Sequence, residues 1–190
     1  MAITFVNAGS VAKAASGNVT PALPASWAAG DVFICLVAAR DNVNCTLPAG
    51  WTAFDAGTNN GTGLRTGAWY RVAQGGDAAP LVTHTAGSYI SSVVVAYRGC
   101  FPGGEIDVTG TVSVNGASTT LTFGSVTTVH ANTQVIELAG VQVGPASAPT
   151  DVSGYSGSPA PTERVDGPYQ ALYAEVVIAD FPKVSPGSTG

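Results

Sequence analysis

The chain has 190 residues, of which 10% are charged, and its formal net charge is −5. This length suits one domain, or two small ones, with a real hydrophobic core. The chain has only two lysines, Lys13 and Lys183, and no basic cluster, so we do not expect it to bind nucleic acid. No run approaches the roughly 20 apolar residues of a membrane-spanning helix, and residues 1–17 lack the plan of a signal peptide. We therefore expect no membrane partner.

Strand-like segments follow one another along the chain, and no window keeps apolar residues at helical spacing for three turns. Runs rich in β-branched and aromatic residues are bounded by Gly, Pro, Asn or Asp turns, a spacing typical of an antiparallel sandwich. "MAITFV" at the N-terminus is interpreted as a first strand. The other predicted strands cover residues 31–40, 65–73, 80–86, 89–99, 120–128, 133–143 and 171–181.

The predicted strand 65–73 carries a large aromatic side chain on each face. Ala68 and Tyr70 share one face, whereas Trp69 and Arg71 share the other. A strand with a single core face would show one apolar side, so a second covered face or a partner is implied. We expect Tyr70 to be buried between two sheets and Trp69 to pack under a loop; a ligand platform is the alternative.

A weak internal repeat indicates two similar halves. It pairs residues 30–38 with 131–139, 47–57 with 158–167, and 67–73 with 171–177. Two such halves would give two sheets that face each other. The predicted fold is therefore all-β, an antiparallel, jelly-roll-like β-sandwich built from two weakly similar halves.

This fold predicts a simple domain organisation. Residues 18–181 form a single sandwich domain, with halves at about 18–110 and 111–181. Residues 1–17 form an N-terminal strand or arm, and residues 182–190 form an extended C-terminal tail. Both ends lack the apolar density to fold alone, so they are expected to become ordered against a neighbour.

Motifs for catalysis and metal binding are sparse. His84 and His130 are separated and unaccompanied, and a lone strand histidine is usually structural. Glu105 and Asp107 alternate on one face and could pair as acid and base in a glycosidase, although a polar strand edge explains them equally well. No phosphate loop or dinucleotide fingerprint is present. We expect no enzymatic activity, no cofactor and no metal site.

Three cysteines make an odd count without metal-type spacing. Cys35 lies inside an apolar run and is most simply a small core residue. Cys45 and Cys100 each fall where a strand gives way to a loop, so a disulfide between them is conceivable. A reducing cytoplasm favours free thiols, and both alternatives stay open.

Five motifs in one order resemble a β-sandwich domain that recurs in tailed-phage virion proteins and some bacterial surface proteins. They are "GDVFICLVA" at 30–38, "LPAGW" at 47–51, "WYRVA" at 69–73, "VVAYRG" at 94–99 and "PGGEIDV" at 102–108. The resemblance covers roughly residues 18–181, and its motifs are turn and core signatures without a catalytic residue. One departure is "RGCF", where the pattern has an apolar residue followed by Asp; it leaves the role of Cys100 open.

The resemblance implies a virion structural protein, and a short chain without a fibre shaft fits a capsid decoration or cement protein best. We expect a protein made in the host cytoplasm that binds the outer surface of a phage head. Its partners would be the major capsid protein and copies of itself in a homotrimer. The expected contact residues are the apolar side chains of the two ends, namely Ile3, Phe5, Val6, Phe181 and Val184.

The alternative function is a carbohydrate-binding or receptor-binding module of a phage tail or bacterial surface protein. Exposed aromatic rings bind the faces of sugars well. The residues expected to form such a glycan platform are Trp51, Trp69 and Tyr97.

Overall fold

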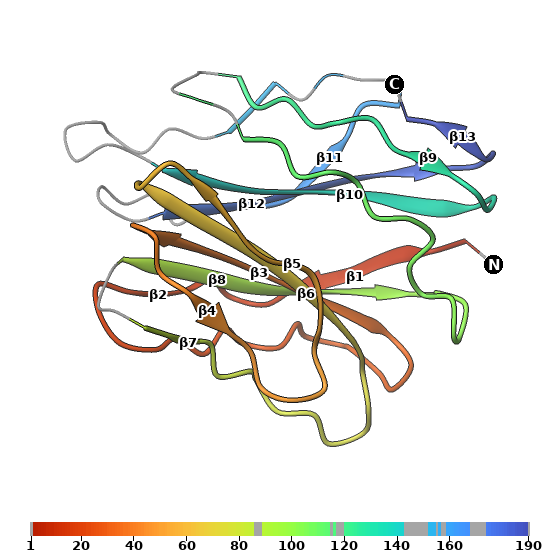
Figure 1. Ribbon diagram of the computed structural model, residues 1–190. Coiled ribbons are helices and arrows are strands. Elements are labelled where there is room, and N and C mark those ends of the chain that lie inside the picture. Colours follow the sequence, from red (N-terminus) through yellow and green to blue (C-terminus); the bar gives the residue numbers. More distant parts are fainter. Residues whose placement is uncertain are drawn as a thin grey trace.

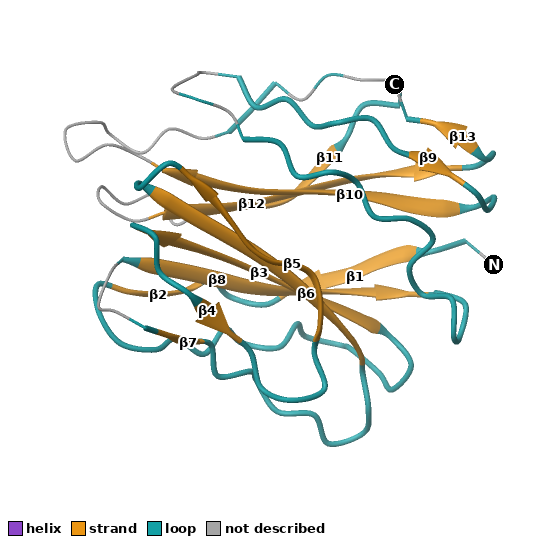
Figure 2. Cartoon of the chain, viewed as in Figure 1, coloured by secondary structure: helices purple, strands orange, loops and turns teal. Residues whose placement is uncertain are grey.

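The computed structural model describes residues 2–85, 89–114, 116, 120–142, 152–154, 156, 159–167 and 174–189. This part of the chain contains strands and no helix (Figure 2), which confirms the predicted all-β class. The strands are β1 (Thr4–Ala8), β2 (Ala12–Ala14), β3 (Val32–Arg40), β4 (Cys45–Thr46), β5 (Thr52–Asn60), β6 (Leu64–Val72), β7 (Thr83–His84), β8 (Ile90–Arg98), β9 (Thr127–Thr128), β10 (Thr133–Gln142), β11 (Thr162–Gly167), β12 (Ala174–Lys183) and β13 (Gly187–Ser188).

A large antiparallel sheet has the strand order β1-β8-β3-β6-β5, and β2 pairs with β8 beyond the end of β1. Its central strands β3 and β8 are each buried along their whole length except at the last residue. Both strands consist of nearly continuous apolar runs, because a strand that is covered on both faces has no solvent side to keep polar.

A small antiparallel sheet, β10-β12-β11, lies over one face of the large sheet (Figure 1). The two sheets form a β-sandwich whose inner core comes from alternate residues of β3, β6, β8 and β12. The inner core includes Ile34, Leu36, Leu64, Val93, Val95, Val176 and Ile178. Part of the segment between β8 and β9 runs along the other side of the small sheet as a further layer (Figure 1).

Loops and the short two-stranded sheet β4-β7 cover the opposite face of the large sheet. Trp27 and Trp51, in the loops before β3 and before β5, pack on Phe33 with ring centroids 5.2 and 6.4 Å away. Trp69 of β6 belongs to the same outer cluster and is 6% exposed. The prediction that Trp69 packs under a loop is therefore confirmed.

Tyr70 points to the inner side of the large sheet, as its alternation with Trp69 predicts, but it is only half-buried. Its ring lies beside Phe54 of β5, with ring centroids 4.9 Å apart. It packs against the inner core without being enclosed by it, so Tyr70 lies at the rim of that core. The expectation of full burial between the sheets is corrected on this point.

An ion pair joins two of the quoted sequence motifs. Asp31, next to Gly30, accepts hydrogen bonds from Arg98 Nε at 2.8 Å and Arg98 Nη2 at 2.7 Å. The Ala28 N–H donates to the same carboxylate, which is almost completely buried. Burial raises the pKa of Asp31, but the hydrogen bonds from Arg98 and Ala28 outweigh it and leave the pKa below its ordinary value.

A second charged cluster joins the two sheets. Tyr97 of β8 donates its hydroxyl to Asp180 of β12 at 2.8 Å. Arg164 of β11 donates two hydrogen bonds, both 2.9 Å long, to the same carboxylate, and its guanidinium lies 4.5 Å from the ring of Phe5. Asp180 is buried, so this cluster satisfies a carboxylate that would otherwise be costly to enclose.

Both ends of the chain pair with strands of the same chain. β1 pairs with β8, and Phe5 packs edge-on against Tyr97 with ring centroids 5.6 Å apart. β13 pairs with β9. The expectation that the ends become ordered only against a neighbour is therefore wrong, since each finds its partner strand within the chain. Neither the jelly-roll connectivity nor the similarity of the two halves is confirmed.

We predict that Asp180→Asn lowers the free energy of unfolding by about 3 kcal/mol, because it breaks a buried ion pair and leaves Arg164 without its counter-charge. Tyr97→Phe removes a single hydrogen bond and should cost about 1 kcal/mol. Guanidinium denaturation followed by tryptophan fluorescence measures both. A loss for Asp180→Asn no larger than that for Tyr97→Phe would contradict this account.

The lowered pKa of Asp31 predicts a pH dependence of stability. Because its folded pKa lies below its unfolded value, the stabilisation is present above about pH 4 and is lost as the pH falls through the folded pKa. Asp31→Asn should therefore be much less stable than the original chain at pH 7, and the difference should be smaller at about pH 3. Denaturation curves at the two pH values test this; an equal difference at both would refute it.

Candidate functional site at the open end of the sandwich

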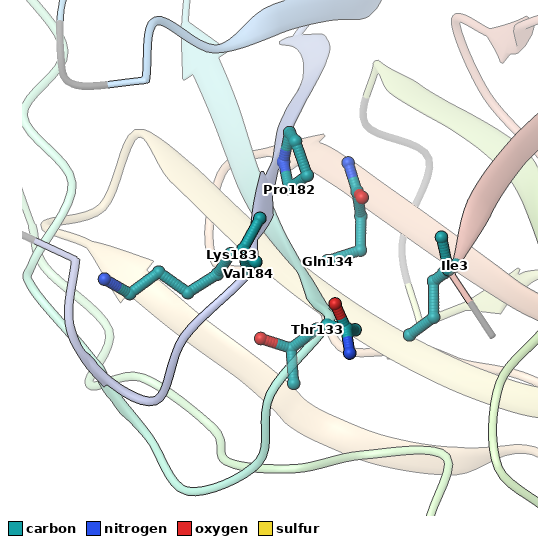
Figure 3. A pocket seen from close by; sticks show the side chains of 8 residues that line it. Ile3, Thr133, Gln134, Pro182, Lys183 and Val184 are labelled. Carbon is teal, nitrogen blue, oxygen red and sulfur yellow. The ribbon is translucent and has the colours of Figure 1, made fainter.

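The N-terminus and the end of β12 lie close together at one end of the sandwich. Figure 1 shows the N-terminus, the turn from β9 to β10, the turn from β12 to β13 and the loop after β8 on the same side of the molecule. A small cavity of about 70 Å³ lies there between the start of β10 and the end of β12 (Figure 3). It is lined by Ala2, Ile3, Asn132, Thr133, Gln134, Pro182, Lys183 and Val184.

Strand pairing explains why these segments converge. Thr4, the first residue of β1, is opposite Arg98, the last residue of β8, and Thr133 is opposite Lys183. Asn132 has a positive φ of 59°, a conformation that asparagine adopts more readily than most residues, and its N–H donates to Val184 O at 3.0 Å. The side chain of Lys183 points away from Ile3 (Figure 3), so the cavity wall is largely apolar.

The most exposed large apolar side chains of the described residues also lie at this end. Phe101 is 77% exposed, Val184 69% and Val129 64%, compared with 55% or less for Leu81, Val112 and Val114. They lie in the loop after β8, directly after β12 and in the turn from β9 to β10 (Figure 1). We call Ile3, Phe101, Val129 and Val184 the apolar end.

Asp107 holds the turn that carries Val129. Its carboxylate accepts the N–H groups of Val129 at 2.8 Å and His130 at 3.2 Å, and Nδ1 of His130 lies 2.5 Å away. Desolvation raises the pKa of Asp107, but its hydrogen bonds to His130 and the backbone outweigh this and lower the pKa overall. Asp107 therefore fixes the shape of the apolar end.

The residues considered for catalysis have different hydrogen-bond partners and do not form one site. Glu105 accepts the Gly103 N–H at 2.7 Å, whereas Asp107 holds the turn at His130, so the two carboxylates have different partners. His84 lies on β7, and its Nε2 contacts Gly17 O. The structure does not bring His84 and His130 together.

The contact residues expected from the sequence divide into two groups. Ile3 and Val184 line the same cavity at the apolar end. Phe5, Val6 and Phe181 instead pack inside the chain: Phe5 on the inner core, Val6 on the outer cluster, and Phe181 as a buried residue of β12. These three are therefore corrected to structural residues.

Sequence reasoning missed Phe101 and Val129. Phe101 lies in "RGCFPGG", where an aromatic residue among turn-forming residues could have indicated an exposed loop. Val129 follows "VTT", which continues the alternation of a strand, so nothing local marks it as exposed.

The expected glycan platform is not formed on the surface. Tyr97 is 1% exposed and Trp69 is buried in the outer cluster, so neither ring presents a face to solvent. Trp51 is half-buried and stacks on Phe33. Tyr97 and Trp69 are also on opposite faces of the large sheet, and this set of three cannot act as one stacking surface.

All three cysteines are free, which answers the open question about a disulfide. Cys45 belongs to the outer cluster, whereas Cys100 packs against the inner core, so the large sheet separates them. Burial raises the pKa of the Cys35 thiol to about 12 and those of Cys45 and Cys100 to about 11. At neutral pH these thiols are protonated and poor nucleophiles.

Comparison with family models, with curated proteins and with solved structures gives no match for this chain. Within the described ranges, no group of three or more His, Cys, Asp or Glu side chains is arranged to hold a metal ion. The same ranges contain no helix long and apolar enough to cross a membrane.

We predict three titratable thiols per chain in denaturant without a reducing agent, because none is paired. In the native protein the reaction with Ellman's reagent at pH 7 should be slow, since burial keeps the thiols protonated. Cys100→Ser should remove one of the three. A count of one thiol in the unreduced, denatured protein would show that a disulfide exists.

Proposed function

We propose that this protein is a non-enzymatic structural protein that decorates the outer surface of a phage head, where it binds the major capsid protein as a homotrimer. The observation that supports the proposal is that the three most exposed large apolar side chains of the described residues all belong to loops at one end of the sandwich. Large apolar side chains that are exposed on one side of a protein are typical of a surface that binds another protein. The sequence resemblance to virion domains indicates the kind of partner.

Apolar contact suits this chain better than ion pairing. Asp31, Asp77 and Asp180 are each already paired with an arginine of the same chain, and Asp107 is hydrogen-bonded to His130. Only 10% of the residues are charged, so few charges remain for an interface. Exposed ion pairs would contribute little in any case.

Strand addition at the edges of the large sheet is less favourable. β1 is short, and its register shifts between Phe5 and Asn7. β5, at the other edge, shifts twice between Ala53 and Thr58. Irregular edges of this kind oppose pairing with another chain. We therefore assign attachment to the apolar end.

The proposal is tested with Val184→Asp and Val129→Asp. Burying a valine contributes about 1.5 to 3 kcal/mol, so each substitution should weaken binding to undecorated heads at least tenfold. Val114→Asp is the matched control, because Val114 is also exposed but lies in the segment between β8 and β9 and is not one of the four residues of the apolar end. Co-sedimentation with heads that lack this protein measures occupancy at micromolar concentration.

The same assay measures how binding to the heads depends on salt concentration. Attachment through apolar contacts should change less than about threefold between 50 mM and 0.5 M salt, where surface charges are strongly screened. The proposal is overturned if the chain fails to bind such heads, if Val184→Asp and Val129→Asp bind normally, or if salt alone releases the protein.

A further inference from the structure

A polar hollow of about 640 Å³ lies beside the end of β6, on surface that the proposed function does not use. β5 begins at Thr52 opposite Tyr70, so no described strand pairs with this edge of β6 from Arg71 onward. The turn that contains Gly50 and the loop that contains Glu105 form the walls. The volume lies within the range of small-molecule sites, about 300 to 1,000 Å³.

The hollow lies across the edge of β6, where Tyr70 lines it from the inner side of the large sheet and Arg71 from the opposite side. Tyr70 is half-buried, so part of its ring remains accessible, and it packs on Phe54 and against the inner core. A ring held in this way loses little conformational entropy when a ligand packs on it. Aromatic side chains with one apolar face and a polar tip are well suited to amphipathic ligands.

Hydrogen bonds within the chain hold the two charged side chains near Tyr70 in place. Arg71 donates to Asp77 at 2.5 Å and to Ala49 O at 3.5 Å, which holds its guanidinium against the turn. Glu105 is held by the Gly103 N–H. Thr52 and Gln74 line the hollow and are exposed, so they can exchange hydrogen bonds with a ligand.

The charge of the hollow restricts the ligand. Asp77 neutralises Arg71, and Glu105 then leaves the lining with a net negative charge. Phosphorylated, sulfated and carboxylated ligands are therefore disfavoured. The amide, the carboxylate, the guanidinium and the threonine hydroxyl offer hydrogen-bonding groups to a neutral ligand rich in hydroxyl groups that lies across the edge of β6.

The site is also too short for a strand of peptide. A side chain at Gly50 would place its Cβ 2.8 Å from Arg71 Nη1, so the turn lies directly against the edge of β6. The free edge runs only from Arg71 to Ala73, after which the chain turns at Gln74–Asp77. β-strand addition needs a longer open edge.

We propose that this hollow binds a neutral saccharide, with Tyr70 as the stacking ring and Thr52, Arg71, Gln74 and Glu105 as hydrogen-bonding groups. This site differs from the glycan platform expected from the sequence, because it uses the half-buried Tyr70 instead of the buried Trp69 and Tyr97. It is independent of attachment to a shell, because it shares no residue with the apolar end.

The test is titration of the full chain with cellotetraose, maltotetraose, chitotetraose and lactose, followed by calorimetry and tryptophan fluorescence. At least one should bind with a dissociation constant below about 1 mM. Tyr70→Leu keeps an apolar contact with Phe54 but removes the ring, and it should weaken binding at least tenfold. Gln74→Ala changes an exposed side chain and should weaken binding several-fold without loss of stability.

Gln134→Ala is the matched control, since Gln134 lines the small cavity at the apolar end and should leave saccharide binding unchanged. Glucose 6-phosphate should bind more weakly than the neutral sugars. The proposal is overturned if none of the four saccharides binds, if Tyr70→Leu and Gln74→Ala bind as well as the original chain, or if an extended peptide competes for the hollow. Tyr70→Leu should still attach normally to the shell. A loss of saccharide binding in this variant can therefore be distinguished from a failure of the proposed decoration function.

Discussion

Strands β3 and β8 have no solvent face, and the other layers of the molecule are arranged to cover them. The small sheet covers one side, and loops that carry Trp27, Trp51 and Val82 cover the other together with the short β4-β7 sheet. Covering both faces requires most of the apolar residues of a chain of this length, so little apolar surface is left over. Exposing Phe101, Val129 and Val184 to water is therefore unfavourable. Their position at one end of the sandwich indicates a surface that binds another protein.

The sequence was sufficient to predict the class of fold and the two covered faces of β6, because both depend on local alternation. Trp69 and Tyr70 point to opposite sides as expected. Contacts between distant segments could not be predicted in the same way. Asp31 and Arg98 are far apart in the sequence, and only the register of β3 against β8 brings them together. The position of Tyr70 at the rim likewise depends on how far the small sheet extends.

The internal repeat agrees with the order of the strands but not with their register. The three repeated segments form strands with the same order in each sheet, β3-β6-β5 and β10-β12-β11. Their register differs, however. Val32 pairs with Val72 in the large sheet, whereas the positions that match them in the repeat, Thr133 and Val176, pair with Lys183 and Gly140. Strand order therefore agrees with two related halves, but residue-level equivalence does not follow from it.

The segment after β8 connects the two surfaces proposed to bind. It supplies Phe101 to the apolar end, Glu105 to the polar hollow, and Asp107 to the turn that carries Val129. Cys100 packs against the inner core, whereas the next residue, Phe101, is 77% exposed. A solvated carboxylate at that position would have repelled an apolar partner, because burying it would cost far more than burying a ring. Phe101 is thus the most exposed large apolar side chain of the described residues, and it lies at the end of the sandwich to which we assign attachment.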